Sequence, residues 1–143
     1  MQVVSCNSFG PIANLTLEDR PSQPIAPGLV RIAVTAAGVN FVDALFVQGL
    51  YQIKPPTPFV PGGEIAGVVT EVGEGVTTHA VGDRVFASTG LGGFTSELVW
   101  PAKRVWHTPS ALTDMSRRQS ASGPRYSPAR LAPAPGSYVR EGA

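Results

Sequence analysis

The stretch VRIAVTAAGVNFVDALFVQG, residues 30–49, decides the fold because it contains a strand pattern followed directly by a helix pattern. In its first part, Val30, Ile32, Val34 and Ala36 alternate with residues that face the other way. Such a period of two is typical of a strand with one buried face. We therefore predict a strand over residues 30–36, with those four side chains on the inner face.

The second part of the stretch predicts a short helix over residues 41–48. Asn40 is a good N-cap residue, and Asp43 stands at the third helical position, where a carboxylate suits the helix dipole. Gly49 can adopt the left-handed conformation that commonly ends a helix. No other part of the chain looks helical.

The rest of the chain up to residue 113 reads as short strands between turns. Residues 65–72 are apolar on both faces and predict a central strand. Shorter runs follow at residues 81–87, 94–100 and 104–107, separated by glycine and proline. With 16 Gly, 14 Pro and only 15% charged residues, the composition favours a mainly β fold, either a small barrel or two packed sheets.

Composition excludes several classes of function. The formal net charge is +1, so we expect no nucleic-acid partner and no anionic membrane surface as a partner. Cys6 is the single cysteine, which excludes an intrachain disulfide. No apolar run approaches the ~20 residues that span a bilayer, so we expect a soluble, cytoplasmic protein.

Residues 114–143 differ in composition from the part before them. They hold five Arg, no Lys and two acidic residues, together with four Pro and five Ser. Few of them are apolar enough to offset the entropy of ordering, so we expect a disordered or non-native tail. A natural tail, a truncation, a shift of reading frame or an artificial end are all compatible with this composition.

Four motifs carry the functional information, and they occur in one order. They are GVNFVD (38–43), GLY (49–51), PGGEIAGVV (61–69) and VGDRV (81–85). Together they resemble the N-terminal GroES-like catalytic domain of the medium-chain dehydrogenase/reductases. The closest resemblance is to the zinc-independent quinone oxidoreductase branch, over about residues 26–112. It implies a GroES-like, partly open β-barrel with one short helix for residues 1–113.

The resemblance also implies that this chain binds no metal. Zinc alcohol dehydrogenases have a cysteine at the position of Asn40 and a histidine at that of Gly63, and neither residue here replaces those donors. His79 and His107 lie in segments far from these positions. Without a Lewis acid, the acceptor must delocalise its own developing charge, as quinones and α,β-unsaturated carbonyls do.

The resemblance suggests three catalytic residues. Asn40 resembles the asparagine of the active site, on the nicotinamide side of the pocket. Tyr51 resembles the tyrosine that lines the substrate pocket, where its hydroxyl can donate to a substrate oxygen. Asp43 matches a neighbouring family position. Each also has a structural interpretation: a helix cap for Asn40, a loop aromatic for Tyr51 and a charge near the helix dipole for Asp43.

A second set of residues is interpreted as structural. Gly62, Gly63 and Gly67 are expected to allow close backbone approach or positive φ. Glu64 is expected to hold a loop or a buried hydrogen bond, and Gly82 and Asp83 are expected to form a turn.

The family's activity depends on NADPH, which its members bind mainly in a Rossmann domain. We find no glycine-rich dinucleotide fingerprint in this chain, so we expect that domain to be absent and the chain alone to be inactive. An enoyl-thioester reductase of the same architecture and a non-catalytic GroES-like binding module remain alternatives. We also expect that the absence of the Rossmann domain leaves an apolar face exposed, and such a face would favour self-association of the chain.

Overall fold

The computed structural model describes residues 1–110, and the predicted tail lies outside these residues. The elements follow in the order β1 (Gln2–Ser5), η1 (Ile12–Asn14), β2 (Thr16–Asp19), β3 (Leu29–Gly38), α1 (Phe41–Gln48), β4 (Glu64–Val72), β5 (Arg84–Ser88), β6 (Glu97–Pro101), η2 (Ala102–Arg104) and β7 (Trp106–His107). The mainly β class and the single α-helix among the described residues are confirmed.

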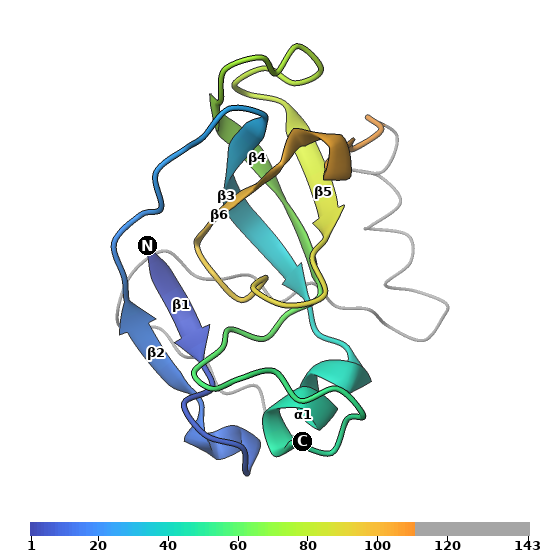
Figure 1. Cartoon of the computed structure of the whole chain (residues 1–143). Coiled ribbons are helices and arrows are strands. Elements are labelled where there is room, and N and C mark those ends of the chain that lie inside the picture. The colour runs from blue at the N-terminus through green and yellow to red at the C-terminus, as the bar shows by residue number, and fades with distance from the viewer. Residues whose placement is uncertain (111–143) are drawn as a thin grey trace.

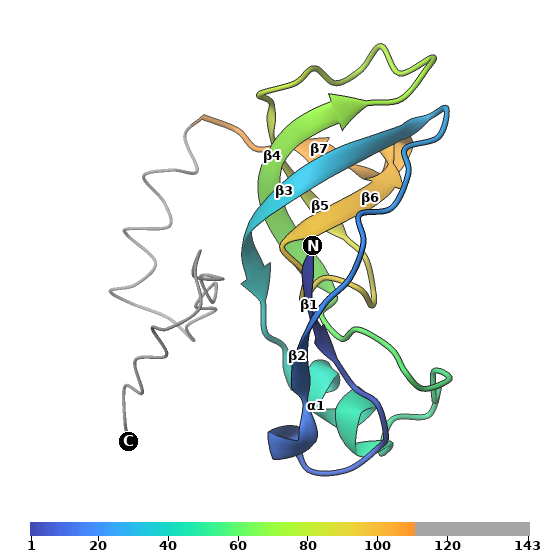
Figure 2. The same ribbon diagram turned by 90° about the vertical axis from the view of Figure 1, so that its left-hand side faces the viewer.

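The strands form two antiparallel sheets. The larger has the order β6-β3-β4-β5-β7, and the smaller pairs β1 with β2. The larger sheet curves strongly without closing into a barrel (Figures 1 and 2). α1 lies beyond the end of β3, beside the small sheet, in both views. The predicted central strand is β4, which pairs with both β3 and β5.

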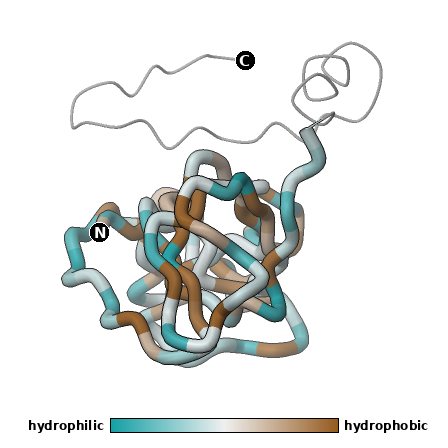
Figure 3. Tube along the Cα trace, turned by 90° about the horizontal axis from the view of Figure 1, so that it is seen from above, coloured by the Kyte–Doolittle hydropathy of each residue, from teal (hydrophilic) through white to brown (hydrophobic). Residues whose placement is uncertain are grey.

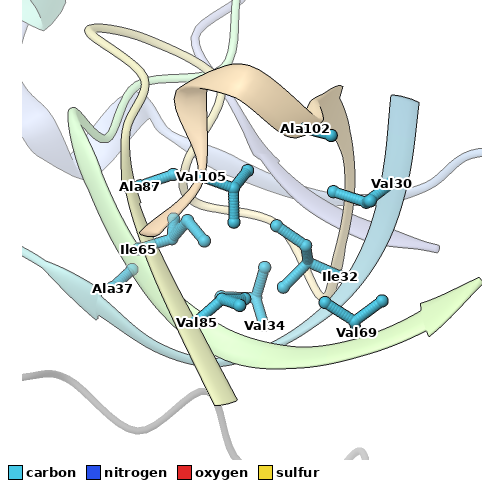
Figure 4. Close-up of a cluster of buried hydrophobic side chains, with 10 residues drawn as sticks. All are labelled: Val30, Ile32, Val34, Ala37, Ile65, Val69, Val85, Ala87, Ala102 and Val105. Carbon is cyan, nitrogen blue, oxygen red and sulfur yellow. The ribbon is translucent and has the colours of Figure 1, made fainter. Parts of the chain in front are cut away.

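The concave side of the larger sheet holds the main core. Valines dominate it, together with Ile32, Ile65 and three alanines (Figure 4). Seen along the view of Figure 3, several hydrophobic stretches cross the middle of the domain. A second, smaller cluster of Cys6, Val47 and Phe59 joins α1 to the N-terminal segment. The 1% exposed Cys6 behaves as a small apolar residue.

The inner face of β3 corrects one prediction. Val30, Ile32 and Val34 are buried as expected, but Ala36 is only half-buried and Ala37 takes the inward position. The cause is a β-bulge between Val34 and Ala36, which adds one residue to β3 opposite β4. After the bulge the alternation is shifted by one, so Ala36 faces outward.

Three elements were not predicted. β2 consists of exposed, mostly polar residues and owes its extended form to pairing with β1 rather than to an apolar pattern. η1 and η2 are single turns of 3-10 helix, too short for a recognisable period. Within residues 1–110, no helix is long and apolar enough to cross a membrane.

Candidate active site

The N-terminus of α1 brings Asn40 and Asp43 together. The backbone N–H of Asn40 donates a hydrogen bond of 2.7 Å to Oδ2 of Asp43, and the N–H of Asp43 donates one of 3.0 Å to the carbonyl of Asn40. Asn40 has extended backbone angles, as an N-cap residue should. At the other end, Gly49 adopts φ 68° and closes the helix. Both predicted helix ends are confirmed.

Asp43 is a buried carboxyl group with an incomplete set of partners. Its side chain is 3% exposed, and its Oδ1 has no hydrogen-bond partner among the described residues. Burial is the main cause that raises the pKa of Asp43, and the nearby Glu64 carboxylate raises it further. The backbone N–H groups of Asn40 and Gly62 oppose these effects.

Glu64 faces the same helix terminus from the first position of β4. Its Oε2 lies 3.4 Å from Nδ2 of Asn40, and its backbone pairs with Gly38 at the end of β3. A Cβ on Gly38 would lie only 3.1 Å from the Glu64 carboxylate, so the small residue leaves room for it. Asn40, Asp43 and Glu64 thus form one polar cluster. Within residues 1–110, the amide of Asn40 keeps one N–H beyond its contact with Glu64 and one acceptor lone pair beyond the capping box.

Tyr51 lies at the opposite end of α1 from this cluster. Its ring packs 4.6 Å from the ring of Phe46, with the planes tilted by 51°. The helix between the two ends is about 12 Å long, from its eight residues at 1.5 Å each. The contacts of the described residues therefore bring Asn40, Asp43 and Glu64 together, and the ring of Tyr51 contacts Phe46 in the second half of α1.

The glycines of the PGGEIAG motif have different roles. Gly62 has φ 99°, and a Cβ there would lie 2.5 Å from Cδ1 of Phe94. A Cβ on Gly67 would collide with the carbonyl oxygen of Ala33 across the β3–β4 pair. Gly63 differs from the expectation, since its φ is not positive and an added Cβ would make an ordinary contact of 3.5 Å with Gly90.

The turn before β5 gathers both histidines of the chain. Gly82 has φ 97°, and Oδ2 of Asp83 accepts a hydrogen bond of 2.8 Å from the N–H of Ala80. The rings of His79 and His107 stack with centroids 4.7 Å apart, and Nδ1 of His107 lies 3.7 Å from Oδ2 of Asp83. The fold therefore joins two segments that the sequence keeps apart. Within residues 1–110, however, no group of three or more His, Cys, Asp or Glu residues could hold a metal ion.

A groove of about 390 Å³ lies on the outer face of the larger sheet, and its lining includes Glu64 of the polar cluster. Two cross-strand rows form it. Gly38, Glu64 and Ser88 pair in one row, and Ala36, Ala66, Phe86 and Trp106 pair in the next. Phe86 is 41% exposed, Trp106 is 49% exposed, and their rings stack 5.8 Å apart.

This groove was not predicted, although the sequence offers the outward positions of neighbouring strands as a signal. Which outward residues stand in one row depends on strand register, and register is set by pairing between distant segments.

Comparison with known proteins identifies the class that this fold and site define. The family described as "Alcohol dehydrogenase GroES-like domain" matches residues 26–110. The chain therefore belongs to this family, within the medium-chain dehydrogenases/reductases, and the predicted resemblance is confirmed.

Among its relatives, the chain is 44% identical over 114 residues to a quinone oxidoreductase-like protein 2 homolog from Nematostella vectensis, over 78% of this chain and 31% of that protein. It is 42% identical over 107 residues to a synaptic vesicle membrane protein VAT-1 homolog from Rattus norvegicus, over 73% of this chain and 26% of that protein. The chain thus spans between a quarter and a third of the length of these curated relatives.

Solved structures agree with this assignment. A human synaptic vesicle membrane protein VAT-1 homolog-like protein has a TM-score of 0.73 and 32% identity, over 77% of this chain and 36% of that one. The Escherichia coli quinone oxidoreductase complexed with NADPH has a TM-score of 0.72 and 28% identity, over 78% of this chain and 34% of that one.

Proposed function

We propose that this chain is the substrate-side domain of a zinc-independent, NADPH-dependent oxidoreductase that reduces quinones or α,β-unsaturated carbonyls. The observation that carries the proposal is the composition of the polar cluster. The amide of Asn40 lies beside Glu64, and Gly63 precedes Glu64 in the chain. Zinc-dependent members of the family have a thiolate at the position of Asn40 and an imidazole at that of Gly63. Such a site can orient a polar acceptor by hydrogen bonds but offers no set of metal donors.

The polar cluster fits the nicotinamide end of NADPH and not its phosphates. Within residues 1–110, Oδ1 of Asn40 keeps one acceptor lone pair beyond the capping box, which suits the amide N–H of a nicotinamide carboxamide. The phosphates do not fit here, because the carboxylates of Asp43 and Glu64 surround the N-terminus of α1, where an anion would otherwise bind. We infer that Asn40 contacts the nicotinamide end and that the phosphates are held outside residues 1–110.

Bound NADPH would supply the hydride, and the residues of this chain would prepare the acceptor. Asn40 would donate a hydrogen bond to an acceptor oxygen, which favours the negative charge that develops there. Glu64 holds the amide by accepting from Nδ2, and Asp43 holds the backbone of Asn40. Tyr51 would cover the flat acceptor or donate from its hydroxyl if the bound acceptor reaches the far end of α1.

Nuclear magnetic resonance of the full 143-residue chain tests the acceptor site. Tetramethyl-1,4-benzoquinone (duroquinone) should shift the side-chain amide signals of Asn40, and Asn40→Ala should weaken its binding. After incubation with zinc and dialysis, metal analysis should find only substoichiometric zinc. One tightly held zinc ion per chain would contradict the proposal. Calorimetry that finds micromolar NADPH affinity for this chain alone would contradict the placement of the phosphates elsewhere.

A chimera tests the reaction. Residues 1–113 would replace the corresponding domain of the Escherichia coli quinone oxidoreductase, and NADPH consumption would be followed with duroquinone and with an enoyl thioester. Turnover of duroquinone that resists chelators is expected, with a lower kcat/KM for Asn40→Ala. Preference for the enoyl thioester would favour the alternative acceptor. A soluble chimera that binds NADPH and reduces neither would support a non-catalytic module.

A further inference from the structure

We propose that the outer-face groove binds the hydrocarbon side chain of a quinone acceptor whose ring lies at the polar cluster. The inference rests on the proposed function and adds the substrate class to it, namely quinones that carry an apolar tail. It follows from the order of residues in the two cross-strand rows.

The two rows have opposite chemistry on one continuous face. The first row, Gly38–Glu64–Ser88, is polar and reaches the amide of Asn40 through Glu64. The second row, Ala36–Ala66–Phe86–Trp106, is entirely apolar and spans four strands, about 14 Å at the usual strand spacing. A ligand that lies across both rows must therefore be polar at one end and apolar at the other.

The shape of the second row favours a thin, flexible group. Ala36 and Ala66 form a low floor, and the stacked rings of Phe86 and Trp106 rise beside it. A β-bulge turns Ala36 outward, which places a methyl group on this floor. The groove volume of about 390 Å³ falls within the usual range for small-molecule sites, although the groove is open on one side.

The spacing of the rows sets the length of tail that gains affinity. Residues two apart on one strand are separated by about 7 Å, so a methyl substituent on the ring ends before the apolar row. Full burial of a methylene strengthens binding about fourfold, and burial on one side about twofold. A hexyl chain, with five more carbons than methyl, should therefore bind about 30-fold more tightly.

The test compares duroquinone with the same ring in which one methyl group is replaced by hexyl. Both are titrated into the full chain and followed by magnetic resonance of the two indole N–H groups and the Asn40 amide. Both quinones should shift the Asn40 signals. Only the hexyl quinone should shift the indole of Trp106, while the buried indole N–H of Trp100 serves as an internal reference.

Three variants locate the tail. Phe86→Ala removes one wall, and Ala66→Leu fills the floor; each should reduce the advantage of the hexyl quinone to a few-fold without changing duroquinone binding. Leu17→Ala is the matched control, because Leu17 is 53% exposed on the small sheet. Unchanged duroquinone binding shows that each variant is folded. Because one variant removes a side chain from the groove and the other adds one, the test can still be read if one of them does not fold.

The other outcomes overturn the proposal in distinguishable ways. Equal affinities of the two quinones would show that the groove does not bind the hydrocarbon tail, and would not affect the proposed function. Binding of 1-hexanol at Trp106, with no quinone shift at Asn40, would make the groove a general hydrocarbon site and would count against the acceptor site as well. Dimerisation in sedimentation that Phe86→Ala abolishes would assign the groove to a second copy of the chain.

Discussion

Asn40 and Asp43 are joined by a backbone-to-carboxylate hydrogen bond of 2.7 Å that begins α1 and buries the carboxyl group at the candidate active site. One contact thus serves both the fold and the site. Asp43 holds the backbone of Asn40, whose side chain we propose to face the acceptor, and it remains a buried group with one oxygen unpartnered among the described residues. The first prediction concerns this buried group.

Asp43→Asn should flatten the dependence of stability on pH. Burial raises the pKa of Asp43 in the folded chain, so the folded state binds the proton more tightly than the unfolded state. The stabilisation that this carboxyl provides is complete below its unfolded pKa and is lost as pH rises through the folded pKa. Urea unfolding at a series of pH values should show this loss in the native chain and not in Asp43→Asn.

Glu18→Gln is the matched control of opposite sign. Hydrogen bonds from Asn7, Arg20 and Thr16 lower the pKa of Glu18 to about 2, so its stabilisation is present above the unfolded pKa and is lost as pH falls towards 2. If both variants changed the acid side of the profile of stability against pH alike, the assignment of the slope to Asp43 would be wrong.

Asp43→Ala removes the acceptor of the Asn40 N–H. It should lower the free energy of unfolding by about 1–3 kcal/mol.

Gly67→Ala should be among the most damaging single substitutions in the larger sheet. The added Cβ would collide with the carbonyl of Ala33 and lie 2.7 Å from Cγ2 of Ile32, which forces the paired strands apart. We expect a loss of about 3 kcal/mol in the free energy of unfolding, measured in urea. Gly63→Ala, four residues earlier, should change it by less than about 0.5 kcal/mol. Similar losses for both would contradict the distinction drawn between these glycines.

Asn40→Asp should destabilise the chain at neutral pH, although aspartate is as good an N-cap residue as asparagine. The new carboxylate would face Oε2 of Glu64, which lies 3.4 Å from the present Nδ2, and would stand beside Asp43. We expect a loss of about 1–2 kcal/mol near pH 7. This loss should shrink as the pH falls and the carboxylates are protonated. Asn40→Ser, a neutral cap, should show no such pH dependence.

Arg31→Met should weaken the larger sheet by about 2 kcal/mol. Nε of Arg31 lies 2.7 Å from Glu71 on β4, and Nη1 lies 2.6 Å from Glu97 on β6, so one guanidinium joins three neighbouring strands. Its side chain is 14% exposed, and its removal leaves two carboxylates without a cation. Glu71→Gln should cost less, because Glu71 is 46% exposed and Arg31 keeps Glu97. Equal costs, measured by urea unfolding, would show that the pair between Arg31 and Glu97 adds no stability.

Both the family and the local elements could be predicted from the sequence. The ends of α1 follow from Asn40, Asp43 and Gly49, because capping depends on backbone groups within about four residues. The central position of β4 follows from its two apolar faces. Residue types at Asn40 and Gly63 already show that the cysteine and histidine donors of zinc-dependent relatives are replaced, since ligand chemistry belongs to the side chain wherever it is placed.

Only the tertiary structure decided which distant residues meet. The bulge in β3 turned Ala36 outward, and strand pairing then aligned it with Ala66, Phe86 and Trp106. The stacking of His79 on His107 and the burial of Asp43 have the same origin. A shift of one residue in register moves every side chain of a strand to the opposite face, and the choice between registers depends on the packing of the whole sheet.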